Sequence, residues 1–389
     1  MGAAGARLTI DLGAVAANYL TLRAAAPGAE VAAVVKANAY GTGMGPVARR
    51  LAAGGCRTFF VADPLEGASL RMALKGVFPE AVIYVLNGLY PGMAAHYAAA
   101  GLRPVIASRA ELTEWSGAGA PLPAALHFDT GMNRLGMSET DAAQISQDKT
   151  LTAGMEIPLI ISHLACADDA GHPRNTRQLG RFREILERLH ASFPLAKASL
   201  ANSGGIYLGP AYHFDMVRPG VSLYGGNPFT GRENPFRPVV TAEARVLAVR
   251  EVEAGDTAGY AATWAARGPA RIAVLAAGYA DGYFRSLSSG FRAGNEGESG
   301  GSVYIGGGFA PVAGRVSMDM AMVDISHLPE GAVKRGDWAE LIGPHMSVDE
   351  VGLRAGTLGY EILTALGARY MRRYIEDGRE SFTEDGGEA

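Results

Sequence analysis

Short apolar runs alternate with alanine-rich, helix-like segments over the first part of the chain. The clearest run is VAAVV at Val31–Val35, five apolar residues in succession, which is typical of a strand buried on both faces. LTIDL at Leu8–Leu12 comes before it, and TFFVA, VIYVL, PVIAS, AALHFDT and PLIISHLA continue the series. Helical patterns such as AVAANYLTLRAAA separate these runs. This alternation predicts βα units and a parallel sheet.

About eight such units, ending near MVRPG at Met216–Gly220, fit a (β/α)₈ TIM barrel. A doubly wound sheet is the main competitor, and the periodicity does not separate the two. The pattern changes at the turn-rich stretch 225–238, after which the chain is mostly strand-like. We therefore expect an α/β chain with a barrel domain at 8–232 and a predominantly β domain at 233–375. Residues 1–7 are a possible addition to the β domain, and the acidic, glycine-rich tail 376–389 is expected to be disordered.

Composition narrows the class of protein. The formal charge of −4 over 389 residues, with no basic cluster interleaved with aromatics, gives no basis for nucleic-acid binding. Two cysteines, Cys56 and Cys166, are too few for a disulfide framework and fit a reducing compartment. The sequence shows no secretory signal and no apolar run long enough to span a membrane. We expect a cytoplasmic enzyme.

Lys36 directly follows the buried run, and Gly41 and Gly43 then turn the chain. A partly desolvated amine at a strand end has a lowered pKa and is a better nucleophile. The chain has only five lysines against thirty arginines, and arginine forms no Schiff base. This suggests that Lys36 holds pyridoxal 5'-phosphate as an imine. A lysine that extends from a strand end to solvent would give the same pattern.

Other polar residues also follow predicted strands, where a barrel gathers its reactive groups. Ser203 and the Gly220–Val221 turn supply the hydroxyl and backbone N–H groups that a phosphate needs. Arg218, if it faces a pyridine nitrogen, would keep that nitrogen unprotonated, which suits removal and return of a proton at one carbon. Taken singly, each residue, His163 included, could equally be a strand-end group bonded to loop backbone. Histidine and cysteine spacings predict no metal site.

The motifs in chain order resemble those of alanine racemases along nearly the whole sequence. The blocks are VVKANAYGTG, DTGMNRLGM, SHLACADD, LANSGG, MVRPGVSLYG, AGYAATW, GYADGY, GRVSMDM and LGYEI. The resemblance implies a pyridoxal-phosphate enzyme of fold type III, with a barrel and a β domain joined in a head-to-tail homodimer. It implies two-base interconversion of L- and D-alanine, for peptidoglycan or for catabolism.

Roles also follow from the resemblance. Lys36 matches the imine lysine, which is the base for D-alanine. Tyr260 matches the catalytic tyrosine that acts on L-alanine and reaches the site of the other subunit. Residues matching cofactor contacts are Tyr40, His163, Ser203, Arg218, Gly220, Val221 and Tyr360. Arg134 and the Met318 backbone match substrate-carboxylate contacts. The substrate access corridor is matched by Asp168, Tyr279, Arg285 and Arg315.

Two positions depart from the family pattern. His127 stands where some members have a carbamylated lysine that orients the substrate-binding arginine, so Arg134 must be positioned differently. Ser199 stands where some members have a histidine that bonds the ring-facing arginine, which leaves open how Arg218 is held. A free phenol has a pKa of about 10, so Tyr260 needs nearby cations or donors, for which His163 and Arg218 are the candidates.

Three classes of protein are alternatives to an alanine racemase. A racemase of broader specificity would act on serine or basic amino acids, but its periplasmic relatives usually carry a signal peptide. A decarboxylase of the same plan uses a different phosphate loop and a cysteine in the second domain, whereas neither cysteine here lies beyond Cys166. A single-barrel cofactor carrier would end near the barrel and lack Tyr260.

Overall fold

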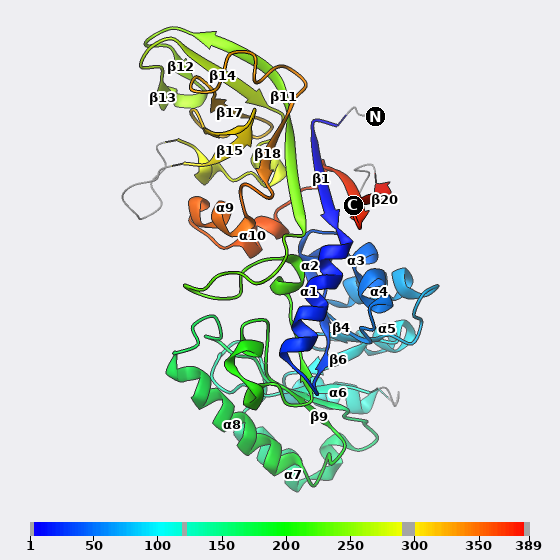
Figure 1. Ribbon diagram of the computed structural model, residues 1–389. Helices are drawn as coiled ribbons and strands as arrows, with labels where there is room; N and C mark the ends of the chain where they lie inside the picture. The colour runs from blue at the N-terminus through cyan, green and yellow to red at the C-terminus, as the bar shows by residue number, and fades with distance from the viewer. Residues whose placement is uncertain (1–3, 119–122, 290–299, 385–389) are drawn as a thin grey trace. The chain divides into compact units, whose positions relative to one another are not determined.

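The computed structural model in Figure 1 describes residues 4–118, 123–289 and 300–384. The chain divides into two compact units. The barrel unit comprises Val15–Leu223 and Asn227–Phe236. The β unit comprises the described parts of Met1–Ala14, Tyr224–Gly226 and Arg237–Ala389. No helix in the described part of the chain is both long and apolar enough to span a bilayer.

The barrel unit is built on short parallel strands. They are β2 (Glu30–Val31), β3 (Ala33–Val34), β4 (Thr58–Val61), β5 (Val82–Val85), β6 (Arg103–Ile106), β7 (Ala125–His127), β8 (Leu159–Ile161), β9 (Lys197–Ser199) and β10 (Met216–Val217). Strands β3 to β9 pair in sequence order, and β10 pairs with β2. On its other side β10 meets β9, where the Asp215 N–H donates to the Ala198 carbonyl (3.1 Å). Each strand neighbours its successor and the ring closes, so this is a barrel and not a doubly wound sheet, whose strand order reverses.

One helix precedes the first of these strands, and the others follow strands of the barrel. They are α1 (Leu12–Ala25), α2 (Lys36–Tyr40), α3 (Met44–Ala53), α4 (Pro64–Leu74), α5 (Ala94–Ala100), α6 (Arg109–Gly117), α7 (Glu139–Gln147) and α8 (Pro173–Leu189). The strand residues are buried on both faces, as in TFFV of β4. Inside the ring the Phe60 and Tyr84 rings stack with centroids 5.1 Å apart among aliphatic side chains such as Val34 and Met216. The interior is a packed core, as barrels require.

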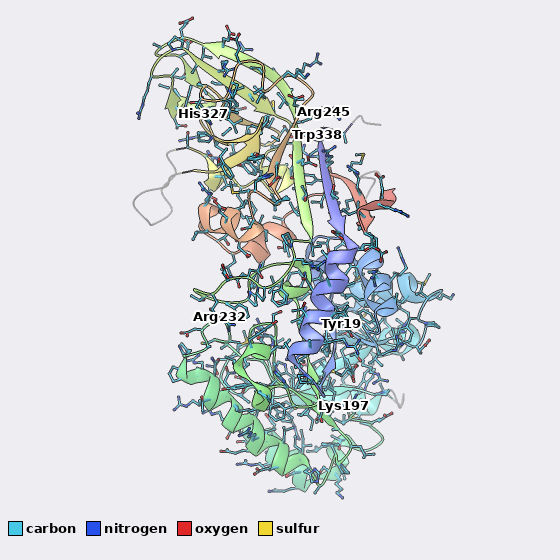
Figure 2. All side chains as sticks on the ribbon, viewed as in Figure 1. Tyr19, Lys197, Arg232, Arg245, His327 and Trp338 are labelled. Atoms are coloured by element: carbon cyan, nitrogen blue, oxygen red, sulfur yellow. The ribbon has the colours of Figure 1, made fainter. Side chains whose placement is uncertain are left out.

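The first apolar run was expected as a barrel strand, and this expectation is wrong. Strand β1 (Ala6–Asp11) belongs to the β unit, where it pairs with β11 (Val240–Val252) and β19 (Met371–Glu376). Its residues alternate between buried and half-buried, as in a strand with one covered face. The Arg7 and Arg245 guanidinium groups lie 4.2 and 4.3 Å from the Trp338 ring (Figure 2). These contacts tie β1 into that sheet, so residues 8–14 leave the expected barrel range.

The β unit contains one large sheet with the strand order β16-β15-β18-β11-β1-β19-β20, in which β14 also pairs with β11, and β17 pairs with β14. Its remaining elements are β12 (Thr257–Ala258), β13 (Trp264–Ala265), β14 (Ala270–Leu275), β15 (Ser302–Ile305), β16 (Gly308–Pro311), β17 (Ala321–Asp324), β18 (Trp338–Ile342), β20 (Arg379–Glu384), α9 (Val348–Ala355) and α10 (Gly359–Thr364). The expectation of a disordered tail from residue 376 is wrong for β20, which pairs with β19. Residues 385–389 lie outside the described part.

Glu30 links barrel strands that are far apart in sequence. Its carboxylate accepts hydrogen bonds from the Thr58 hydroxyl at the start of β4 (2.5 Å) and from the Lys197 ammonium at the start of β9 (2.7 Å). Lys197 is labelled in Figure 2. One carboxylate therefore bridges the two sides of the seam where β10 closes the ring.

Replacing Glu30 by Ala should lower the free energy of unfolding by about 1–2 kcal/mol, since two charge-assisted bonds are lost and one partner is half exposed. Urea denaturation followed by circular dichroism measures the change. The control is Glu187→Ala on the exposed face of α8, which should shift stability by less than about 0.5 kcal/mol. Equal effects of the two substitutions would contradict a role of Glu30 at the seam.

Candidate active site

Lys36 follows the buried residues Val31–Val35 and is itself half-buried. Burial is the main cause that lowers the pKa of its amine, the Arg134 charge lowers it further, and the Glu66 carboxylate opposes both. A lowered pKa increases the fraction of neutral amine at neutral pH, and only the neutral amine attacks a carbonyl. The strand end therefore presents a lysine prepared for imine formation.

The backbone directly after Lys36 is left-handed. Ala37, Asn38, Ala39 and Tyr40 have φ values of 52°, 51°, 54° and 53°. For residues with a side chain this conformation costs roughly 1–2 kcal/mol each, so it persists only where surrounding bonds fix it. The Gly41 N–H donates to the Ala37 carbonyl (2.8 Å), and the Asn38 side chain accepts the Met44 N–H (2.8 Å). This turn leads the chain from the strand end into α3.

Arg218 is buried at 3% exposure, and its guanidinium is held by oxygen atoms. It donates to the Ser199 hydroxyl and to the Ser162 carbonyl (2.6 Å), while the Ser199 hydroxyl donates to the Met216 carbonyl (2.6 Å). Ser199 therefore does hold Arg218, which the sequence left open. Burial lowers the pKa of Arg218 to about 10, so the group stays charged at neutral pH.

Two imidazoles near this cation are uncharged. His163 Nδ1 lies 3.5 Å from the Arg218 guanidinium, and burial, followed by the Arg218 charge, holds the pKa of His163 well below its usual range. His127 is 9% exposed, and burial, then Arg218, lowers its pKa to about 4 against the opposing effect of Asp129. Its Nδ1 has no hydrogen-bond partner among the described residues. A neutral His127 cannot orient Arg134 as an anion would.

The Ser203 hydroxyl forms the centre of a polar cradle. Its Oγ, on a residue 5% exposed, accepts the N–H groups of Gly220 (3.0 Å) and Ser222 (3.5 Å). A side chain on Gly220 would collide with the Tyr40 hydroxyl, so the glycine admits that phenol to the backbone. The buried Ser222 hydroxyl has no partner among the described residues. Hydroxyls and backbone N–H groups in this arrangement suit a phosphate.

Two more predicted residues lie in loops at the carboxyl ends of neighbouring barrel strands. Arg134 is exposed in the loop after β7, and Asp168 is exposed in the loop after β8. The Asp168 carboxylate accepts a hydrogen bond from the Thr230 hydroxyl (3.1 Å). With Lys36, Tyr40, His163, Ser203, Arg218, Gly220 and Val221, they make up the barrel group of site residues.

Most of the remaining predicted residues meet around the segment 315–318 of the β unit. The Tyr279 N–H donates to the Ser317 carbonyl (3.0 Å) and the Ala280 N–H donates to the Met318 carbonyl (3.1 Å). The Ser288 hydroxyl accepts from the Val316 N–H (3.0 Å) and donates to the Arg285 carbonyl (2.6 Å). Gly259, next to Tyr260, abuts the Arg315 backbone. Tyr360 lies on α10.

Arg369 stabilises this group of β-unit residues through two carboxylates. Its guanidinium binds both carboxylate oxygens of the buried Asp281 (2.8 and 2.7 Å) and one oxygen of Asp319 (2.6 Å). Asp281 also accepts the Gly278 N–H (2.9 Å). The turn that carries Tyr279 and the loop that carries Met318 are thereby joined.

Three further residues of the barrel unit were missed by the sequence reasoning. Ser162 and Ser222 each stand beside a predicted site residue, and this adjacency was the available signal. Glu66 accepts the Ala37 N–H (2.5 Å) directly after the lysine. Its signal is the spacing from Asp63 to Glu66, an N-cap residue followed three positions later by glutamate.

Comparison with known proteins gives consistent results. The family models described as alanine racemase, N-terminal domain, and alanine racemase, C-terminal domain, match residues 10–228 and 239–374. The alanine racemase of Methylobacterium nodulans is 50% identical over 376 residues, which cover 96% of each chain. A protein of Mesorhizobium japonicum named alanine racemase, catabolic, is 47% identical over 377 residues, covering 96% of this chain and 94% of the relative.

A solved structure agrees with these matches. It is the alanine racemase from Bartonella henselae with covalently bound pyridoxal phosphate, and its TM-score is 0.86 at 40% sequence identity. The alignment covers 96% of this chain and 100% of that one. Because both halves of the chain match the family in order and nearly to their full length, this chain belongs to the alanine racemase family.

Proposed function

We propose that the chain is a pyridoxal-phosphate-dependent alanine racemase in which Lys36 and Tyr260 handle the proton on opposite faces of the substrate carbon. The observation that carries the proposal is the setting of Lys36, whose amine has a lowered pKa at the end of a buried strand. The names of the relatives support alanine as the substrate.

The barrel group fits the cofactor. When bound, pyridoxal phosphate withdraws electrons from the substrate's α-carbon and so makes its hydrogen more acidic. The Ser203 hydroxyl, the Tyr40 phenol and the backbone at Gly220–Val221 would hold the phosphate. The Ser222 hydroxyl, which has no partner among the residues that the structure describes, would add another donor. Arg218 would face the ring nitrogen and keep it unprotonated. The family resemblance adds Tyr360 to the cofactor contacts.

Two side chains then move the proton. Neutral Lys36 takes it from D-alanine, and Tyr260 takes it from L-alanine. A phenol with a pKa of about 10 needs positive charge nearby to act as a base. His163 is uncharged, so Arg218 is the cation of the pair, and His163 contributes by hydrogen bonding. Arg134 and the Met318 N–H would bind the substrate carboxylate.

A second copy of the chain would complete the site. Tyr260 is 73% exposed in the single chain, whereas a catalytic phenol needs a dry and charged surrounding. Large apolar side chains are exposed on the same unit: Tyr279, Met318, Met320, Leu353 and Leu358. These features support a homodimer in which the β unit of one copy supplies Tyr260 and Met318 to the other. Asp168, Tyr279, Arg285 and Arg315 would line the access corridor.

The setting of the enzyme is part of the proposal. The two unpaired cysteines support a cytoplasmic location, because thiols stay reduced there. The product D-alanine would serve peptidoglycan synthesis, or the reverse reaction would open a catabolic route. A chiral assay across amino acids with added pyridoxal phosphate tests the specificity, and comparable turnover of serine or a basic amino acid would favour a broader racemase.

Replacing Lys36 by Ala should abolish the visible absorbance of cofactor-loaded protein, because the imine would lose the amine that forms it. The measurement is the absorbance spectrum of protein that has been loaded with pyridoxal phosphate and then dialysed against cofactor-free buffer. Lys149→Ala, a change at an exposed lysine, is the matched control and should leave the band intact. Persistence of the band without Lys36 would assign the imine to another residue.

Replacing Tyr260 by Phe should retain the cofactor and lower racemisation by about 10²–10⁴-fold, since one proton-transfer group is lost. The loss should be larger for hydrogen exchange from L-alanine than from D-alanine, measured by deuterium uptake in heavy water. Tyr90→Phe, at another exposed tyrosine, should have no such effect. Near-normal turnover of Tyr260→Phe in both directions would contradict the two-base assignment.

Mixing the Lys36→Ala and Tyr260→Phe proteins should restore activity if sites are shared. Random exchange makes half of the dimers mixed, each with one intact site, so about a quarter of wild-type activity is expected. The measurement is turnover after subunit exchange has been verified with two differently tagged chains. If activity does not return in verified mixed dimers, the composite site is wrong.

A further inference from the structure

Glu66 connects the residue after the lysine to the residue after the next strand. One carboxylate oxygen accepts the Ala37 N–H (2.5 Å) and the other accepts the Ala62 N–H (2.8 Å). Glu66 is the third residue of α4, whose N-cap is Asp63. The backbone that leaves Lys36 is therefore bonded to the end of β4 through one side chain.

This bond falls where the backbone most needs an external partner. Ala37 is the first of four left-handed residues, and their conformation is unfavourable without surrounding bonds. A charged acceptor makes a shorter and stronger hydrogen bond than a neutral one. Glu66 thus contributes to the direction in which the chain leaves the lysine.

Glu111 makes a similar pair of hydrogen bonds elsewhere in the barrel unit. Glu111 is the third residue of α6, whose N-cap is Ser108. Its carboxylate accepts the Ala107 N–H (3.2 Å) directly after β6 and the Leu89 N–H (3.1 Å) in the loop after β5. The tether alone is therefore a means of holding barrel loops together. What distinguishes Glu66 is that the tethered residue follows Lys36.

The charges that face Lys36 come from several elements. Arg134, after β7, lowers the pKa of the amine in addition to burial, and Glu66, on α4, raises it. His163, after β8, also faces the lysine but is uncharged. Glu66 is therefore the anion set against Arg134 in this balance.

We propose that Glu66 is a positioning residue for the racemase reaction, which fixes the backbone after Lys36 and supplies a carboxylate charge opposite Arg134. The inference rests on the proposed role of Lys36. Glu66 would have two separate effects. Its hydrogen bonds hold two loops together, as those of Glu111 also do, and its charge raises the pKa of Lys36, which Glu111 does not affect.

The test compares Glu66→Gln with Glu111→Gln in the full-length chain freed of pyridoxal phosphate. Both changes keep one acceptor oxygen and remove one charge. The pH dependence of Lys36 labelling by acetic anhydride is followed by peptide mass spectrometry, with exposed Lys149 as the internal reference. Because only the neutral amine reacts and Glu66 raises its pKa, the midpoint in Glu66→Gln should fall by about 0.5–1 pH unit. Glu111→Gln should leave it unchanged.

Glu66→Asp separates the two effects, because it keeps the charge but shortens the reach. It should restore most of the midpoint, whereas the loss of the tether should place its melting temperature below that of the unsubstituted chain. If Glu66→Gln and Glu111→Gln give the same midpoint for Lys36 labelling, the proposed effect of the Glu66 charge on Lys36 is wrong. Glu66 then only holds the two loops together. The labelling needs no cofactor and no turnover, so this result is independent of whether Lys36→Ala abolishes the visible band.

Discussion

The chemistry of this protein depends on positive charge held at the carboxyl ends of the barrel strands. Arg218 is buried there against oxygen atoms of Ser199 and Ser162, and Arg134 lies in the loop after β7. Burial and the Arg134 charge lower the pKa of Lys36, while burial and the charges of both arginines lower the pKa values of His127 and His163, which are neutral. The same charges favour a phosphate and a substrate carboxylate. One electrostatic arrangement thus prepares the nucleophile and attracts the anions it must meet.

The backbone of the barrel fixes the positions of these charged and polar groups. Parallel strands end at one rim, which brings residues from β3, β8, β9 and β10 together although they are far apart in sequence. Small residues then admit close approaches, as Gly220 does for the Tyr40 phenol. The left-handed turn after Lys36 is the costly part of this design, and bonds from neighbouring loops stabilise it. Rigidity at the rim is consistent with a reaction that removes and returns one proton at one carbon.

Much of the fold and of the site could be predicted from local pattern. A run such as VAAVV before a lysine has few interpretations, and strands in series predict a barrel once their order is known. The LTIDL run was misassigned because a short apolar segment does not reveal its partners, which the pairing of β1 with β11 and β19 identifies. The strand β20 was missed because its composition is polar, whereas edge strands need only backbone pairing.

The sequence could not predict the role of a side chain where that role depends on a contact with a residue far away in the chain. Ser199 is a short side chain in a strand, and its bond to Arg218 becomes visible only when β9 and β10 are neighbours. In the sequence Glu66 has the position of an ordinary capping residue. Its role becomes visible only from the hydrogen bond that it accepts from the Ala37 N–H, directly after Lys36.

The solvent exposure of Tyr260 in the single chain affects its chemistry. A phenol that is 73% exposed is surrounded by water, and water screens the cations that could make it acidic. In the proposed mechanism the barrel unit of one copy supplies the cations and the β unit of a second copy supplies the phenol, which requires a surface that excludes water from both. In the proposed dimer, association therefore changes the chemistry of the phenol itself and does more than stabilise the fold. In that dimer Met318 would serve the site of the other subunit, and its loop would be positioned by its own unit, in which Arg369 binds Asp281 and Asp319.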